Sequence, residues 1–128
     1  MHEFGIASGI WQAVMAAARE HGGGRVRAIT VELGELNLIE DEQLRFWMTA
    51  LAERDGSPGV ELRIAHLPPR VRCRECGEES AVELAGEVAS WFVSPALSCP
   101  RCGSREVEVI GGREIRVVSA EVDTGPES

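Results

Sequence analysis

The first part of the chain carries hydrophobic residues at the spacing of an α-helix. Between residues 3 and 20, apolar side chains recur every three or four positions, which predicts an amphipathic helix with one buried stripe. Three consecutive glycines at 22–24 end this helix, because glycine tolerates the left-handed backbone in which helices commonly terminate. The residues expected on the stripe are Ala7, Ile10, Trp11, Val14, Ala17 and Ala18.

Two strand patterns flank a second helical pattern. Residues 25–36 and 61–67 combine aliphatic residues with polar interruptions, as strands do when one face covers a core. Between them, residues 41–54 return to helical spacing, and Asp41 is placed to cap this helix. A last strand is expected over residues 113–122. The apolar residues predicted on the buried side of the second helix are Leu44, Trp47, Met48 and Leu51.

Two amphipathic helices need a surface against which to bury their apolar stripes. A roughly three-stranded sheet with both helices packed on one face would bury the two stripes together, so the predicted fold class is α+β. Pro68 and Pro69 interrupt the pattern, and a segment with four cysteines follows them. We therefore expect one domain formed by residues 1–69 and 112–128, with a four-cysteine module, residues 70–111, inserted between two strands.

Charge and hydropathy exclude some classes of partner. The 128-residue chain has a formal net charge of −8, whereas nucleic-acid-binding proteins normally present a basic face. No apolar stretch approaches the roughly 20 residues that a membrane-spanning helix needs. Residues 4–18 are rich in apolar side chains, but His2 and Glu3 stand where a signal peptide has its basic segment. We therefore expect a cytoplasmic protein with reduced thiols, which binds neither nucleic acid nor membrane.

The four cysteines form two pairs with the spacing of zinc knuckles. Cys73 and Cys76, and then Cys99 and Cys102, are separated by two residues, and a glycine follows each pair. Two such turns supply the tetrahedral sulfur shell that Zn²⁺ accepts, in a zinc-ribbon-like module. Because four thiolates leave no position for water, we expect a structural zinc ion. The apolar residues expected in a hairpin or ribbon between the knuckles are Val88, Trp91, Phe92 and Val93.

Other chemistries also use cysteine pairs. A thioredoxin-like redox site uses one CxxC pair, whereas this chain has two. Two disulfides would require an oxidising compartment, to which nothing in the sequence points. An iron–sulfur cluster takes four cysteines as well, but the two-knuckle layout with a glycine after each pair favours zinc.

The first three residues offer a set of nitrogen donors. Met1 should be retained ahead of a bulky histidine, which leaves the α-amine, the backbone nitrogens of His2 and Glu3, and the His2 imidazole within one chelate. Ni(II) and Cu(II) both favour such tetragonal, nitrogen-rich sites. The Glu3 carboxylate is either an added oxygen ligand or a charge at the helix start. His21 is more simply explained as a helix C-terminal residue, and His66 as a packed or hydrogen-bonded strand residue.

Five segments carry a resemblance to a known family. They are the opening MHEF, the strand RVRAITVELGELN, the cysteine pairs CRECG and CPRCGS, and the closing GGREIRVVSAEVD. They follow one another in the family's order and cover nearly the whole chain. The sequence resembles the HypA/HybF family of nickel metallochaperones, which serve the maturation of [NiFe]-hydrogenase.

The resemblance implies both a cargo and a resident metal. It assigns nickel to Met1, His2 and Glu3, and zinc to the four cysteines. It also implies a carrier that is not an enzyme and that delivers nickel, with a partner GTPase, to the hydrogenase large subunit. Some relatives also serve urease maturation, and a homodimer is a further assembly left open. Glu40 or Asp41 could add an oxygen ligand, but a charge at the start of the second helix is the simpler interpretation.

Two other classes of function remain as alternatives. A zinc-ribbon adaptor would use the module only for protein–protein contact, and its N-terminus would be irrelevant. A thiol oxidoreductase would use the cysteine pairs for redox chemistry. A His2→Ala variant that loses tight nickel binding would exclude the adaptor, and tightly held zinc without reactive thiols would exclude the oxidoreductase.

Overall fold

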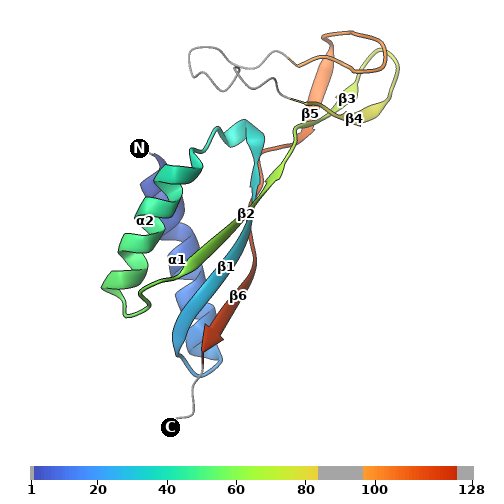
Figure 1. Ribbon diagram of the computed structural model, residues 1–128. Coiled ribbons are helices and arrows are strands. Elements are labelled where there is room, and N and C mark those ends of the chain that lie inside the picture. The colour runs from blue at the N-terminus through green and yellow to red at the C-terminus, as the bar shows by residue number, and fades with distance from the viewer. Residues whose placement is uncertain (1, 84–96, 124–128) are drawn as a thin grey trace. The chain divides into compact units, whose positions relative to one another are not determined.

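The computed structural model describes residues 2–83 and 97–123, which Figure 1 draws in colour. The chain divides into two compact units, which are described in turn. Unit 1 consists of Met1–Glu32, Ile39–Ala65 and Arg116–Ser128, and unit 2 consists of Leu33–Leu38 and His66–Ile115.

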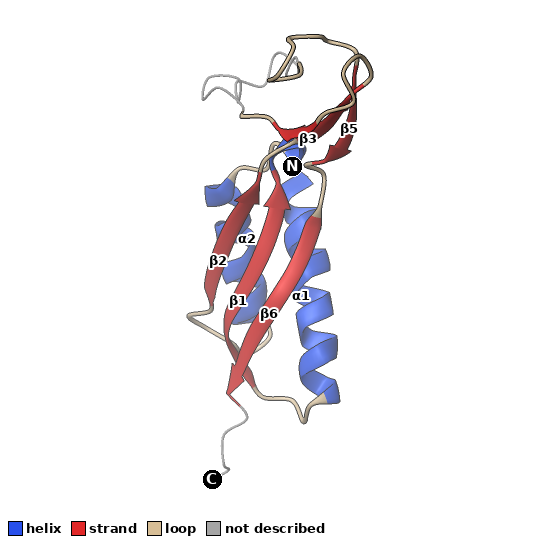
Figure 2. Ribbon diagram, turned by 90° about the vertical axis from the view of Figure 1, so that its right-hand side faces the viewer, coloured by secondary structure: helices blue, strands red, loops and turns tan. Residues whose placement is uncertain are grey.

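Unit 1 has two helices on one face of a three-stranded sheet. Helix α1 spans His2–Glu20 and helix α2 spans Asp41–Arg54. The sheet has the order β2-β1-β6, with β1 at Arg25–Gly34, β2 at Glu61–Leu67 and β6 at Ile115–Asp123. Figure 2 shows both helices behind the sheet, with β1 and β2 pointing the same way and β6 running opposite. The α+β fold predicted from the sequence, with two helices on a three-stranded sheet, is confirmed.

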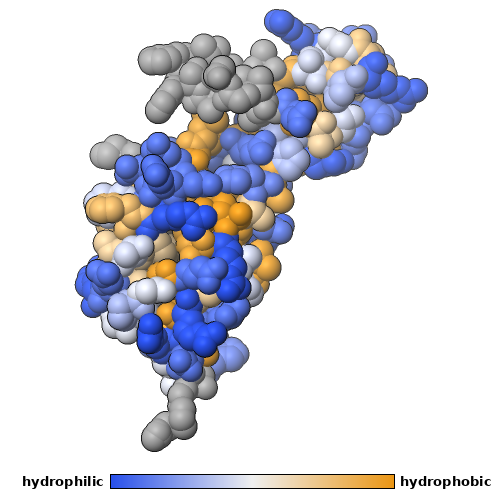
Figure 3. Space-filling view, in the orientation of Figure 1, coloured by the Kyte–Doolittle hydropathy of each residue, from blue (hydrophilic) through white to orange (hydrophobic). Residues whose placement is uncertain are grey.

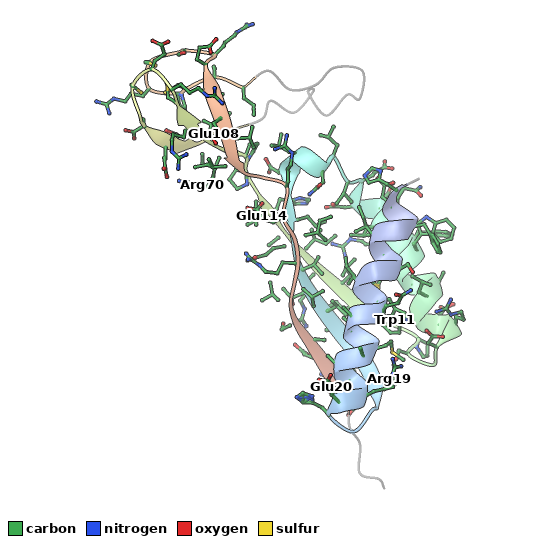
Figure 4. The ribbon with its side chains drawn as sticks, turned by 180° about the vertical axis from the view of Figure 1, so that it is seen from behind. Trp11, Arg19, Glu20, Arg70, Glu108 and Glu114 are labelled. Carbon is green, nitrogen blue, oxygen red and sulfur yellow. The ribbon has the colours of Figure 1, made fainter. Side chains whose placement is uncertain are left out.

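The apolar stripe of α1 builds the core of unit 1. Five of the six residues predicted on this stripe are buried, and Trp11 is only 1% exposed. Its indole N–H donates to the Asp55 carboxylate just after α2 (2.8 Å), which satisfies the one polar atom of the ring. Figure 4 shows Trp11 on the side of α1 that faces α2. Ala17, predicted to be buried, is exposed, whereas Glu3 is buried.

Helix α2 starts differently from the prediction. The backbone N–H of Leu44 donates to the Glu40 carbonyl (3.0 Å), which makes Glu40 the N-cap and Asp41 the first helical residue. The expected capping by Asp41 is therefore wrong, and the Glu40 side chain makes no capping hydrogen bond. The buried residues of α2 are Leu44, Met48, Leu51 and Ala52, whereas Trp47, predicted to be buried, is partly exposed.

Strand β1 ends at Gly34, two residues earlier than predicted. A Cβ atom on Gly34 would lie 2.2 Å from the carbonyl carbon and oxygen of Gly112, so the two backbones are in direct contact. The Gly34 N–H donates to the Glu114 carbonyl (2.6 Å), and the Leu36 N–H donates to the Gly112 carbonyl (2.9 Å). The chain then turns into the short 3₁₀ helix η1, Glu35–Asn37. Alternating hydrophobicity could not reveal this end, because the contact depends on a distant part of the sequence.

Unit 2 contains a second three-stranded sheet, made of short strands. Its order is β4-β3-β5, with β3 at Arg70–Cys73, β4 at Glu79–Ala81 and β5 at Val107–Gly111. Both pairings are antiparallel, and Figure 4 shows Arg70 and Glu108 on neighbouring strands of this sheet. The hairpin or ribbon predicted for Val88, Trp91, Phe92 and Val93 lies outside the described residues.

Ion pairs cover the exposed faces of both sheets. In unit 1, Arg63 on β2 contacts the Glu121 carboxylate on β6 at 2.9 Å, across the central strand β1. In unit 2, Arg72 lies between Glu79 (2.9 Å) and Glu108 (3.3 Å), which stand opposite it on the two flanking strands. These side chains are roughly half exposed, so the pairs set the charge pattern of the surface and add little to stability.

Aromatic side chains reach the surface of the helical layer of unit 1. Phe4 is 44% exposed and Phe46 is 59% exposed. Both rings pack edge-on against Trp47, with ring centroids 5.0 Å apart. Figure 3 shows hydrophobic residues among hydrophilic ones on this side of the unit. Within residues 2–83 and 97–123, no helix is long and apolar enough to cross a bilayer.

The contact between Gly34 and Gly112 predicts a strong effect of a single methyl group. In Gly34→Ala the new Cβ collides with backbone, which cannot rotate away, and we expect a loss of roughly 1–3 kcal/mol or more in the free energy of unfolding. The matched control is Gly9→Ala on α1, where a Cβ meets no atom within 4 Å. That variant should gain up to about 1 kcal/mol because alanine favours a helix. Urea denaturation measures both, and equal stability of the two variants would contradict the contact.

Candidate metal centres

The first cysteine pair lies in a tight turn at the end of β3. The Cys73 N–H donates to the Glu78 carbonyl, and the Gly77 N–H donates to the Cys73 carbonyl, both at 2.9 Å. Gly77 has a φ of +79°, a left-handed conformation that glycine adopts at no steric cost. Inside the turn, the backbone N–H groups of Glu75 and Cys76 donate to the Cys73 sulfur, at 3.3 and 3.4 Å.

The second cysteine pair lies in an equivalent turn. The Cys99 N–H donates to the Ser104 carbonyl (2.9 Å), and the Gly103 N–H donates to the Cys99 carbonyl (2.8 Å). Gly103 has a φ of +80°, close to that of the first glycine. The equivalence follows from the shared pattern of two residues between the cysteines and a glycine directly after the second.

The two turns bring four sulfur atoms together. The Sγ atoms of Cys73 and Cys102 are 3.6 Å apart, those of Cys76 and Cys99 are 3.7 Å apart, and all four lie within 4.8 Å of one another. A tetrahedral ion with metal–sulfur bonds of about 2.3 Å needs sulfur separations of about 3.8 Å, so the cluster fits zinc. In the described part of the chain, this is the one group of three or more Cys, His, Asp or Glu side chains that could hold a metal ion.

The four thiols differ in how readily they lose a proton: the pKa is lowered for Cys73 and Cys99 and raised for Cys76 and Cys102. The Cys76 backbone N–H lowers the pKa of the Cys73 thiol to about 7, and the Cys102 backbone N–H lowers the pKa of Cys99. Although the Ser104 backbone N–H lowers the pKa of Cys102, its sulfur neighbours and burial raise that pKa to about 12. Four thiolates at this distance repel one another, so a divalent ion would replace the protons that otherwise remain.

The hydrophobic core of unit 2 is small. Its fully buried side chains include Pro69, Val71, Cys73 and Cys99. An ion pair between Arg101 and Glu78 (3.0 Å) joins the two cysteine turns, but both side chains are largely exposed and such pairs contribute little. The sulfur cluster is therefore the main link between the two turns, and a metal would supply most of its strength.

His2, in the predicted nickel site, lies at the start of α1, whereas Met1 is outside the described residues. The His2 side chain is 56% exposed, and its Nδ1 lies 3.8 Å from Glu3 Oε1. The first four N–H groups of a helix have no acceptor inside that helix. The backbone nitrogens of His2 and Glu3 are therefore not committed to the hydrogen-bond ladder of α1.

The Glu3 side chain, in contrast, is buried. Glu3 is only 6% exposed, and its Oε2 accepts a hydrogen bond from the backbone N–H of Glu40 (3.0 Å). This hydrogen bond outweighs the effect of burial and lowers the pKa of Glu3 to about 2, so the side chain is an anion at neutral pH. Glu3 thus provides a negative acceptor at the start of α2, where the Glu40 side chain provides none.

The other residues considered as ligands lie at element ends. Glu40 and Asp41 are the N-cap and the first residue of α2, as the helix-end interpretation requires. His21 follows α1, with its Nδ1 3.2 Å from the Ala17 carbonyl. His66 is exposed near the end of β2.

The contact between Glu3 and Glu40 is not predicted above, although the sequence contains one signal for it. Glu3 precedes Ala7 by four residues and Ile10 by seven, so it falls on the buried stripe of α1. A charged group on a buried stripe needs a partner. The partner is a backbone N–H on another helix, and no side-chain pattern in the sequence identifies it.

Comparisons with known proteins agree over the whole chain. The profile of a family described as "Hydrogenase/urease nickel incorporation, metallochaperone, hypA" matches residues 1–122. The hydrogenase maturation factor HypA of Methanosarcina acetivorans is 37% identical, with 99% of each chain covered. The factor of the same name from Acidithiobacillus ferrooxidans is 32% identical and covers 96% of this chain and 100% of its own.

Solved structures share the fold. The solution structure of the Ni metallochaperone HypA from Helicobacter pylori superposes with a TM-score of 0.60 at 18% identity, covering 95% of this chain and 97% of that chain. A second solution structure, described as HypA protein, gives a TM-score of 0.62 at 18% identity, with coverages of 95% and 96%. With the family profile and the curated relatives, the conclusion is that this chain belongs to the HypA family of hydrogenase maturation nickel metallochaperones.

Proposed function

We propose that this chain carries Ni(II) at its N-terminus. The ligands are the α-amine of Met1, the backbone nitrogens of His2 and Glu3, and the His2 imidazole, a nitrogen-rich set that suits Ni(II). The observation that carries the proposal is the exposed His2 in the first turn of α1, where backbone nitrogens lack helical acceptors. The family description supports nickel over copper, because it names nickel incorporation.

The four cysteines hold a structural zinc ion in this proposal. The sulfur–sulfur distances are close to the edge length of a tetrahedral zinc–sulfur site, which supports zinc. A closed shell of four sulfurs leaves no position for a substrate. The zinc-binding module is assigned to residues 70–111, and the nickel-binding domain to residues 1–69 and 112–128. The thiolates then serve stability and take no part in redox chemistry.

The cargo is delivered without catalysis. In the proposed sequence of events, the chain hands nickel, together with a maturation GTPase, to the [NiFe]-hydrogenase large subunit in the cytoplasm. Ligands at a chain terminus suit a carrier, since a terminus can exchange its ion more readily than a buried cage. A homodimer and urease-maturation proteins are further partners to be tested, whereas nucleic acid and membrane play no role.

The first prediction for this function concerns His2. His2→Ala removes the imidazole ligand, and we expect nickel affinity to fall at least about tenfold, which corresponds to about 1.4 kcal/mol. The control is His21→Ala, which changes an exposed histidine at the other end of α1 and should bind nickel as the wild type does. Isothermal titration with Ni²⁺ measures both. A zinc-ribbon adaptor with an irrelevant N-terminus would give the same weak binding for all three proteins.

The second prediction concerns the terminal amine. Protons compete with nickel for the amine and the imidazole, so affinity should decrease as the pH falls. A variant with one residue added before Met1 keeps every side chain but moves the amine, and it should bind nickel more weakly. Titrations at several pH values test both points. Amine ligation would be excluded if the nickel affinity did not change with pH and was the same in the extended variant.

The third prediction concerns zinc. Metal analysis should find one tightly held zinc per chain in the wild type and loss of it in Cys99→Ser, while Ser104→Ala, which changes a neighbouring side chain, should keep it. Removal of zinc should abolish amide-exchange protection in β3 and β5 of unit 2 and leave protection in α1 and α2, because unit 1 has its own hydrophobic core. Persistent protection of β3 and β5 without zinc would contradict a structural role. Reactive thiols in the zinc-loaded protein would instead favour an oxidoreductase.

A further inference from the structure

The first turn of α1 contacts α2 at two points, its N-cap and its middle. The Glu3 carboxylate accepts a hydrogen bond from the Glu40 backbone N–H at 3.0 Å. The next residue, Phe4, packs its ring edge-on against Trp47, with centroids 5.0 Å apart. Both contacts join segments that are far apart in the sequence, and Glu3 directly follows His2.

The two side chains of the proposed nickel segment differ in exposure. The His2 side chain is 56% exposed, whereas that of Glu3 is 8% exposed. An ion arriving from solvent therefore meets the imidazole, while the carboxylate lies inside the contact between the two helices. Oε2 accepts the hydrogen bond, whereas Oε1 lies 3.8 Å from His2 Nδ1. A carboxylate that turned outward to bind the ion through both oxygens would give up its hydrogen bond at the start of α2, where the Glu40 side chain makes no capping hydrogen bond.

We propose that Glu3 is a positioning residue, whose carboxylate anchors the first turn of α1 to the N-cap of α2 and does not itself bind nickel. The inference rests on the proposed nickel site at the N-terminus and deepens it. The backbone nitrogen of Glu3 remains a ligand, and its side chain holds that nitrogen in place. The anchor acts through the Glu40 backbone, so no other side chain is needed.

An anchor of this kind raises the affinity for nickel because it preorganises the backbone nitrogens that bind the ion. A chelate formed from backbone nitrogens must fix several dihedral angles at the moment of binding, which costs conformational entropy. Fixing the first turn of α1 in advance removes part of that cost.

Two mild substitutions separate an anchor from a ligand. Glu3→Gln keeps the length and an acceptor oxygen for the Glu40 N–H, but an amide oxygen is a poor substitute for a carboxylate ligand. Glu3→Asp keeps the carboxylate but is one methylene too short to reach Glu40. Glu42→Gln is the matched control, because it removes an exposed carboxylate from the same first turn of α2.

Each protein is titrated with Ni²⁺ alone, its nickel absorption bands are recorded, and the exchange protection of the Glu40 amide is measured by NMR. We expect Glu3→Gln to keep protection, affinity and band positions close to those of the wild type and of Glu42→Gln. Glu3→Asp should lose protection and bind nickel about tenfold more weakly, with unchanged band positions.

Three results would overturn the proposal. Loss of nickel affinity or shifted bands in Glu3→Gln, with the Glu40 amide still protected, would make the carboxylate a ligand. Wild-type affinity in Glu3→Asp without protection would make the anchor irrelevant to nickel. An unprotected Glu40 amide in the wild type would remove the anchor itself. Failure of the proposed nickel site is recognised separately, because His2→Ala would then bind nickel as the wild type does.

Discussion

Unit 2 depends on a constraint set by four sulfur atoms. Its strands are three to five residues long, and its fully buried side chains include the two cysteines Cys73 and Cys99. The four Sγ atoms lie within 4.8 Å of one another, a distance at which four thiolates would repel one another strongly. A divalent ion would remove this conflict and make the cluster the main link between the two turns. Unit 1 follows the opposite logic, since two helices bury a continuous apolar stripe against a sheet and need no metal.

Within unit 1, the same helix contributes to the core and carries the proposed nickel site. The residues from Ala7 to Ala18 bury the apolar side of α1, with Trp11 bonded to Asp55 after α2. The first turn continues the buried stripe with Glu3, a charged residue, and presents His2 to solvent. The buried stripe thus ends in a carboxylate that is hydrogen-bonded to the Glu40 backbone. This contact holds the first turn of α1 against α2 while His2 remains at the surface.

Periodicity and spacing were enough to predict most of the fold and the cysteine site. The limits of α1, α2 and β2 and the pairing of cysteine turns depend on local patterns, which the sequence displays directly. Two of the differences from the prediction share one cause, since each depends on contact between distant segments. Strand β1 ends at Gly34 because of Gly112, and α2 is capped across the helix pair by Glu3 through the Glu40 backbone. Backbone contacts of this kind produce no pattern of side chains in the sequence. A charged residue on a buried stripe does indicate that an unidentified partner must lie near it.

The account assigns two metals to two chemically different sets of donors, sulfur in unit 2 and nitrogen at the N-terminus. X-ray absorption at the zinc and nickel edges of protein loaded with one ion of each tests this separation most directly. We predict a zinc shell of four sulfur atoms at about 2.3 Å and a nickel shell of nitrogen and oxygen donors without sulfur. Sulfur in the nickel shell, or fewer than four sulfur atoms around zinc, would contradict the account.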